Sequence, residues 1–227
     1  MPGPTAFHYH GTAAESASDM IISHKHRYIF LAIPKTGTHS VRQALRQQMG
    51  EQDLEQVGLF VQKKFPFPEF KDIRHGHIST QQIRPVLGEQ IFSSYTKFAF
   101  VRNPFDRFVS YCAFMSRDSN VFETEPLRYM KYVIREQKPV DHLLYQPQHA
   151  MVTDENGGLQ LDQVGRNETM QQSYDEICRK LGLQSSELGR INSSRHRPYQ
   201  EYYDRDLVGW VSDLYRKDLD LFNYRFD

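Results

Sequence analysis

Cysteine is scarce in this 227-residue sequence, which has only two, Cys112 and Cys178. Each lies beside apolar residues in a segment whose pattern is typical of a helix, so we expect two buried free thiols and no disulfide. A chain of this length can bury enough apolar surface to fold as one domain without a disulfide or a metal ion. The low cysteine content therefore favours a reducing, cytoplasmic location.

Long apolar runs are also absent, as is a net charge. No run approaches the roughly 18–20 apolar residues that a membrane span needs, and residues 1–18 lack the basic and apolar regions of a secretory signal. Lys plus Arg and Asp plus Glu each number 28. We expect no membrane span and no nucleic-acid partner, although the overall charge balance by itself says nothing about either. Any anion site must come from local clusters of charge.

Strands and helices are expected to alternate along the chain. The pattern predicts buried strands over 28–33 and 97–101, a hairpin over 150–161, and helices over 41–49, 104–115, 173–181 and 206–219, with interrupted helix over 117–147. This alternation predicts a three-layer α/β/α fold around a central, mostly parallel sheet. Residues 1–26 are expected to form a flexible arm, and residues 27–227 a single domain.

The first motif lies between the strand over 28–33 and the helix that follows it. It reads Pro-Lys-Thr-Gly-Thr-His-Ser over residues 34–40. A helix N-terminus binds anions through its backbone N–H groups and its dipole, and Gly37 lets the backbone approach the ligand closely. Lys35 adds a positive charge, and hydroxyl groups add donors. The order differs from a Walker A loop, which ends in Gly-Lys-Ser/Thr.

This motif resembles the 5′-phosphosulfate-binding loop of sulfotransferases that use 3′-phosphoadenosine 5′-phosphosulfate (PAPS). The resemblance implies that Lys35 contacts the bridging oxygen and stabilises negative charge as the sulfuryl group leaves. A P-loop-like core is expected, and no metal is required, because lysine and backbone donors would supply the positive field. The loop residues expected to bind PAPS are Lys35, Thr36, Gly37, Thr38, His39 and Ser40.

The second motif, Val-Arg-Asn-Pro-Phe-Asp over residues 101–106, follows the strand over 97–101. Asn103 at the N-cap and Pro104 at the first helical position are typical of a helix start. The segment resembles the family's 3′-phosphate site, which implies that Arg102 and Ser110 bind that phosphate. Arg107 has a simpler interpretation, as a surface residue paired with Asp106 or Asp118.

Two histidines lie between these motifs, in the sequence His75-Gly76-His77-Ile78-Ser79. Histidine has a suitable pKa to take the proton of an acceptor hydroxyl. The segment resembles the base-bearing segment of the uronyl/heparan 2-O-sulfotransferase branch, which implies that His77 is the base and that His75 assists it or binds substrate. Glu69 and Asp72 are the reserve candidates for the base.

Three further residues are candidates on weaker grounds. Gln148, in a segment that also looks like this branch, is a candidate substrate contact. Arg195 and Arg197 belong to a local basic cluster that is either a solvated loop or a lid over the 3′-phosphate and adenine.

The sequence thus predicts a sulfotransferase that moves a sulfuryl group from PAPS to an acceptor hydroxyl by in-line transfer. The histidine segment favours a carbohydrate acceptor, a tyrosine in a peptide is the second choice, and a small molecule is the third. A nucleotide kinase that needs ATP and magnesium is a different enzyme class, and a module that binds the nucleotide without turnover is the non-enzymatic alternative. The oligomeric state is left open.

Overall fold

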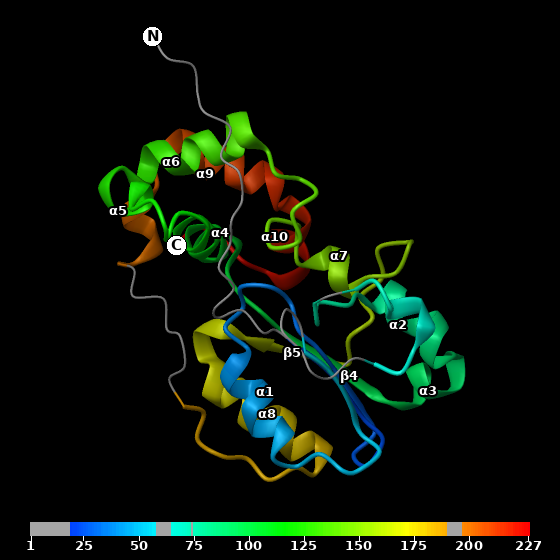
Figure 1. The fold of residues 1–227 in the computed structure, drawn as a ribbon. Helices are drawn as coiled ribbons and strands as arrows, with labels where there is room; N and C mark the ends of the chain where they lie inside the picture. The colour runs from blue at the N-terminus through cyan, green and yellow to red at the C-terminus, as the bar shows by residue number, and fades with distance from the viewer. Residues whose placement is uncertain (1–18, 58–64, 74, 190–196) are drawn as a thin grey trace.

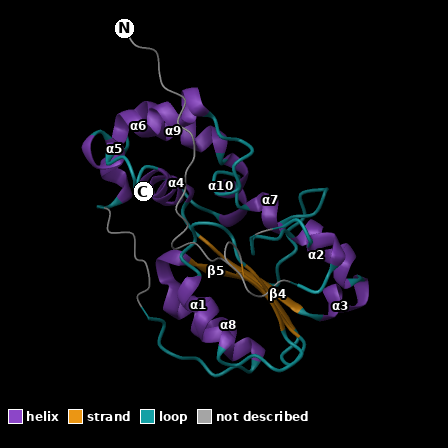
Figure 2. Cartoon of the chain, viewed as in Figure 1, coloured by secondary structure: helices purple, strands orange, loops and turns teal. Residues whose placement is uncertain are grey.

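A computed structural model describes residues 19–57, 65–73, 75–189 and 197–227. Its centre is a sheet, drawn in orange in Figure 2. The sheet has five strands in the order β3-β1-β2-β4-β5. The strands are β1 (Asp19–Ser23), β2 (Tyr28–Leu31), β3 (Leu54–Val57), β4 (Thr96–Val101) and β5 (Gln163–Arg166). β2, β4 and β5 are parallel, and β1 is antiparallel to its neighbours β2 and β3. Four of the five strands therefore point the same way, which confirms the predicted mostly parallel sheet.

Strand β1 corrects the predicted N-terminal arm. Residues 1–18 lie outside the described residues, but Asp19–Ser23 form an inner strand that pairs with β2 on one side and β3 on the other. Met20, Ile21 and Ile22 in this strand are fully buried. An apolar run of only three residues is a weak sequence signal, and its pairing partner β3 is distant in the sequence. The ordered fold therefore begins before residue 27.

One face of the sheet is covered by α1 (His39–Arg46) and α8 (Met170–Leu181), which lie side by side in Figure 1. Tyr28 and Phe30 of β2 belong to the cluster on this face, together with Cys178 of α8. Cys178 is a buried free thiol, and so is Cys112, as predicted.

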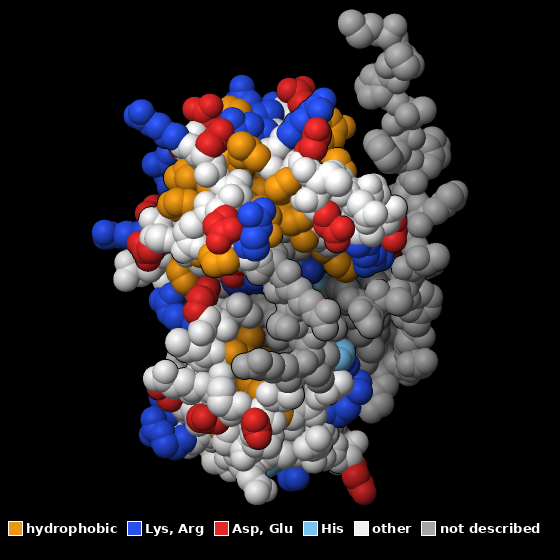
Figure 3. Space-filling model, turned by 90° about the vertical axis from the view of Figure 1, so that its left-hand side faces the viewer, with side chains coloured by type: hydrophobic (Ala, Val, Ile, Leu, Met, Phe, Trp, Pro, Cys, Tyr) orange, Lys and Arg blue, Asp and Glu red, His pale blue; other side chains and the backbone are white. Residues whose placement is uncertain are grey.

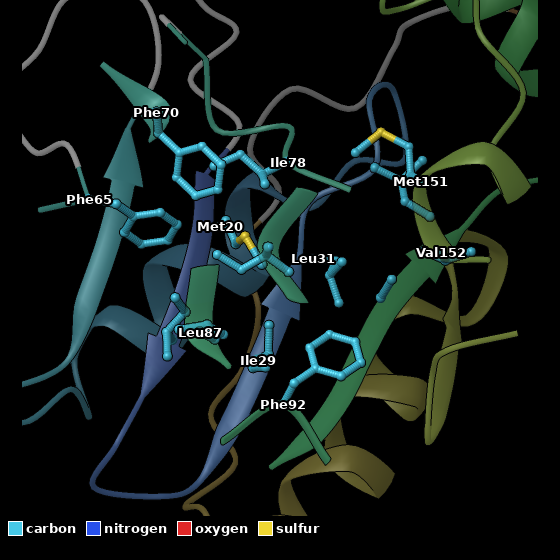
Figure 4. Packing of buried hydrophobic residues seen from close by; sticks show 14 of the residues in the cluster. Met20, Ile29, Leu31, Phe65, Phe70, Ile78, Leu87, Phe92, Met151 and Val152 are labelled. Carbon is cyan, nitrogen blue, oxygen red and sulfur yellow. The ribbon is translucent and has the colours of Figure 1, made fainter. Parts of the chain in front are cut away.

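The opposite face is covered by α2 (Thr80–Leu87) and α3 (Glu89–Ser94). Here Ile29 and Leu31 of β2 pack with Leu87 of α2 and Phe92 of α3, in the cluster shown in Figure 4. Successive residues of a strand point to opposite faces, so β2 is buried on both sides. The predicted three-layer α/β/α arrangement is confirmed.

The remaining helices form a block beyond the carboxyl ends of the parallel strands (Figure 1). They are α4 (Pro104–Met115), α5 (Val121–Thr124), α6 (Pro126–Tyr132), the π-helix η2 (Val133–Gln137), α9 (Arg205–Leu214) and α10 (Arg216–Phe222). The short helix α7 (His149–Val152) lies between α10 and α2 and contacts both. Three short 3₁₀ segments complete the described elements, η1 (Pro68–Phe70), η3 (Asn167–Thr169) and η4 (Tyr199–Tyr202). Much of α4 is buried in the second apolar cluster of the protein, with α9 packed against it.

The predicted hairpin over 150–161 is only partly correct. Its turn exists, because Gly157 N donates to Asp154 O at 3.0 Å. The first predicted strand is instead α7, whose turn is closed by Thr153 N donating to His149 O at 3.0 Å, and a single antiparallel bridge joins Thr153 to Leu159. One bridge supplies too few ladder hydrogen bonds to hold an extended pair of strands.

The predicted helix over 206–219 is two helices, α9 and α10, which meet at Tyr215. Tyr215 is almost fully buried, and its hydroxyl donates to Tyr145 O at 2.7 Å. This contact spans 70 residues of sequence, so the periodicity of the helix alone cannot reveal it.

Candidate functional site

The loop over residues 33–40 leaves the carboxyl end of β2 and leads into α1. Lys35 and Gly37 both have left-handed backbone angles, with φ of 64° and 73°. The Thr36 hydroxyl donates to Ile33 O at 2.8 Å and so closes the loop on itself. Thr38 is the N-cap of α1, but its side chain makes no capping hydrogen bond. The first N–H groups of the helix therefore have no partner from this cap, which is the arrangement that attracts an anion.

Gly37 cannot be exchanged for a larger residue without moving its neighbour. A Cβ at this position would lie 2.6 Å from Asn167 Nδ2. The same Asn167 amide donates to Thr36 O at 2.9 Å, so the residue that follows β5 holds the 33–40 loop from outside. The glycine is required both by its positive φ and by this close approach.

The Lys35 side chain is half-buried, and its Nζ lies 4.3 Å from the centre of the Phe114 ring. Burial, together with the positive charges of Arg102, Arg107 and Arg117, lowers the pKa of Lys35 to about 7. Clustered positive charge with little solvation is a favourable setting for a multiply charged anion, because the anion relieves the repulsion among the cations.

Arg102 connects the second motif to the first. Its Nη1 lies 3.3 Å from Lys35 O, and its Nε donates to Asp106 Oδ2 at 2.6 Å. Arg102 follows β4, and α4 then begins as predicted, with the Asn103 side chain accepting from Phe105 N at 3.0 Å. Ser110 lies on α4 and is buried. The two motifs, separated by about 60 residues of sequence, thus meet at one edge of the sheet.

Arg107 is not the surface residue that the sequence suggested. It is 2% exposed, and its guanidinium donates to three backbone carbonyl oxygens, Pro34 O at 2.9 Å, Leu144 O at 3.1 Å and Gln146 O at 2.9 Å. Burial lowers the pKa of Arg107. The arginine therefore fixes the start of the 33–40 loop to the segment before α7.

His77 lies against the same loop. Its side chain is 4% exposed, and Nδ1 lies 2.6 Å from Ala32 O. A carbonyl oxygen accepts hydrogen bonds and cannot donate them, so Nδ1 carries the proton and the lone pair is on Nε2. Burial lowers the pKa of His77 to about 3, so the imidazole is neutral at pH 7. A neutral histidine in this tautomer can accept a proton.

His75 is next to His77, with their ring centres 6.1 Å apart. It is half-buried, burial lowers its pKa, and its Nδ1 has no hydrogen-bond partner among the described residues. The reserve candidates Glu69 and Asp72 are exposed.

Gln148 has a contact that differs from the one expected with substrate. The side chain is fully buried, with Oε1 accepting from Arg102 N and Nε2 donating to Arg102 O, both at 2.9 Å. Its amide is therefore engaged by the backbone of Arg102, which argues against direct contact with a substrate.

The basic cluster near the C-terminus is described only in part. Arg195 lies outside the described residues. Arg197 is exposed, with Nη1 3.3 Å from Glu201 Oε2 and the guanidinium over the Tyr202 ring. The lid assigned to these two arginines stays a prediction.

The sequence reasoning missed two residues that follow β5. Asn167 holds the 33–40 loop, as described above. Glu168 accepts from Asn103 N at 2.6 Å through Oε1 and from the Tyr224 hydroxyl at 2.8 Å through Oε2. Their position after a strand parallel to β4 was the available signal, since parallel strands end at one edge, but β5 itself was not predicted.

Charge on the surface is mixed, and Figure 3 shows acidic and basic side chains interspersed on one face. Among the described residues, no three His, Cys, Asp or Glu side chains are grouped so that they could hold a metal ion. Within the same part of the chain, every helix is too short or too polar to cross a membrane.

Comparison with known proteins gives one match. A family model described as "Sulfotransferase family" matches residues 18–225. No curated protein and no solved structure matches the chain.

Proposed function

The chain belongs to the sulfotransferase family, and we propose that it transfers a sulfuryl group from PAPS to a hydroxyl of a carbohydrate acceptor. The observation that carries this proposal is the hydrogen bond between His77 Nδ1 and Ala32 O at 2.6 Å. Ala32 is three residues before Lys35, so a proton acceptor lies beside the loop that would hold the group being transferred. A phosphate-binding loop alone would suit many nucleotide-binding proteins, whereas this pairing suits transfer to a hydroxyl.

The donor would be held at both of its charged ends. The backbone of the 33–40 loop, the N-terminus of α1 and Lys35 would bind the 5′-phosphosulfate. Arg102 and Ser110 would bind the 3′-phosphate, with Arg102 positioned by its contacts to Asp106 and Lys35 O. Arginine suits this task because its planar guanidinium can form two parallel hydrogen bonds to a phosphate.

Transfer would be a single displacement at sulfur. The acceptor oxygen forms a bond to sulfur while the bond from sulfur to the bridging phosphate oxygen breaks, and 3′-phosphoadenosine 5′-phosphate (PAP) leaves. The hydroxyl proton goes to His77 Nε2. Lys35 and the loop amides stabilise the negative charge that develops on the bridging oxygen, which is where preorganised donors lower the barrier most.

The low pKa of His77 is compatible with this role. In the unliganded protein, burial holds the pKa at about 3, which would make the imidazole a weak base. PAPS brings several negative charges to the neighbouring loop, and nearby negative charge favours the protonated form of histidine. We therefore expect donor binding to raise the pKa of His77 toward neutrality.

Donor binding is the first test of the proposal. Calorimetric titration with PAP in EDTA should show tight binding, while ATP under the same conditions should bind weakly. Arg102→Ala should weaken PAP binding by about 10- to 100-fold, because a hydrogen-bonded charge pair is lost. Arg84→Ala is the matched control, since Arg84 of α2 is paired with the exposed Glu89 and belongs to neither motif, so its loss should leave PAP affinity unchanged. A preference for ATP that requires magnesium would favour a kinase instead.

The affinity for PAP should also fall as the pH rises above 7. The pKa of Lys35 is about 7 in the unliganded protein, so at higher pH the lysine is mostly neutral and must take up a proton before it can pair with the anion. Below pH 7 it is already charged. Titrations at pH 6.5, 7.5 and 8.5 in two buffers of different ionisation enthalpy would measure this uptake. Lys35→Arg stays charged throughout, so its affinity should lack this part of the pH dependence; an identical profile for both proteins would contradict the assignment.

A further inference from the structure

The segment over residues 144–149 is anchored by one buried carboxylate. Asp218 of α10 is fully buried, and it accepts from Gln148 N at 2.7 Å, from His149 N at 2.8 Å and from the His149 ring Nδ1 at 2.7 Å. A buried carboxylate is costly unless it is fully hydrogen-bonded. Three donors on two adjacent residues meet this requirement and fix the direction of the chain at the start of α7.

The residue fixed in this way holds Arg102. Gln148 is also fully buried, and its amide forms both an accepted and a donated hydrogen bond with the backbone of Arg102. Two bonds from one planar amide determine the position and the orientation of that peptide unit. Arg102 follows β4 directly. The Gln148 amide therefore also sets the path of the chain as it leaves the strand and the backbone position from which the Arg102 side chain extends.

The same segment also supports the 33–40 loop. Leu144 O and Gln146 O accept from Arg107 Nη2, and Arg107 Nε donates to Pro34 O. Burial lowers the pKa of Arg107, whereas the negative charge of Asp218 acts in the opposite direction and favours the charged guanidinium. Asp218 therefore acts on both anion-binding motifs through one segment.

We propose that Asp218 is a positioning residue for the donor site, acting through Gln148 on Arg102 and through the 144–149 segment on the 33–40 loop. The inference rests on the proposed function, since it concerns how the site for PAPS is held. Asp218 does not touch the donor in this scheme. Asp218 keeps Arg102 and the 33–40 loop, which come from distant parts of the sequence, at the separation that the two phosphate ends of one ligand require.

The test is the affinity for PAP, measured by calorimetry, in Asp218→Asn. An asparagine can accept through one oxygen only, and its NH₂ group would face an N–H donor, so the start of α7 must shift. We expect PAP binding to weaken about 10- to 100-fold, as is typical when a binding group is displaced by about 1 Å. Asp220→Asn is the matched control, because it makes the same chemical change at an exposed position of α10.

A second variant, Gln148→Met, keeps the test decisive if Asp218→Asn fails to fold. Gln148→Met keeps the size of the side chain but removes the amide, so it should weaken PAP binding by a similar factor. The double variant carries both Asp218→Asn and Gln148→Met. Its PAP affinity should be no lower than that of whichever single variant binds PAP less tightly, because both changes act through the same contacts. Thermal unfolding of each protein separates this effect from a structural role alone, which would lower the melting temperature but leave the affinity of the folded protein unchanged.

The outcomes are distinct. Wild-type affinity in folded Asp218→Asn or in folded Gln148→Met would overturn the inference while leaving the proposed function intact. Failure of the wild-type protein to bind PAP would overturn the proposed function, and the inference with it.

Discussion

Replacement of His77 by asparagine is expected to slow sulfuryl transfer by about 10²- to 10⁴-fold, the range typical of losing a general base. Asparagine can still donate an N–H to Ala32 O, as His77 Nδ1 does now, so the buried contact and the fold should persist. It has no group that takes up a proton near neutral pH. Donor binding should therefore be retained, and the loss should fall on the transfer step.

The measurement uses radiolabelled PAPS and a panel of neutral oligosaccharides, uronate-containing oligosaccharides and tyrosine peptides, with PAP affinity measured in parallel. His24→Asn is the matched control, since it makes the same change at a histidine outside the candidate site, where Nδ1 lies 2.7 Å from the Tyr95 hydroxyl. If His77→Asn kept the wild-type rate, the base would lie elsewhere, with Glu69 and Asp72 the next candidates. If the wild-type protein bound PAP but modified no acceptor in a broad panel, the interpretation as a nucleotide-binding module would gain support.

Replacement of Arg107 by methionine is expected to cost about 3–5 kcal/mol of unfolding free energy, the range seen when one partner of a buried charge arrangement is removed. Methionine fills a similar space but donates nothing, so Pro34 O, Leu144 O and Gln146 O lose a buried donor. Each orphaned carbonyl adds a desolvation cost. The substitution would also remove the buried guanidinium whose charged form the negative charge of Asp218 now favours.

Urea denaturation followed by circular dichroism would measure this loss. Arg84→Met serves as the control, because Arg84 is a surface residue paired with Glu89, and it should unfold like the wild-type protein. An Arg107→Met variant as stable as the wild type would show that the three carbonyls find other partners, and the structural role given to this arginine would be wrong.

Much of the fold could be predicted from local patterns. The buried runs over 28–33 and 97–101 became β2 and β4, and the Asn-Pro helix start became α4. These features depend on residues close together in the sequence, so propensity, capping and periodicity are enough to find them. β1 and β5 were missed because their apolar patterns are weak, and each pairs with a strand that is distant in the sequence, β3 and β4 respectively.

The residues of the candidate site were predictable, but the contacts among them were not. The sequence by itself determined a glycine-containing loop before a helix start, an arginine after a strand and a pair of histidines, because each depends on a contiguous motif. Only the tertiary structure decided that Arg102 reaches Lys35 O, that the Gln148 amide hydrogen-bonds to the backbone of Arg102, and that Arg107 is buried. The physical reason is that buried polar groups must be satisfied by whichever groups the packed fold brings together, and those partners lie 37 to 73 residues apart in this chain.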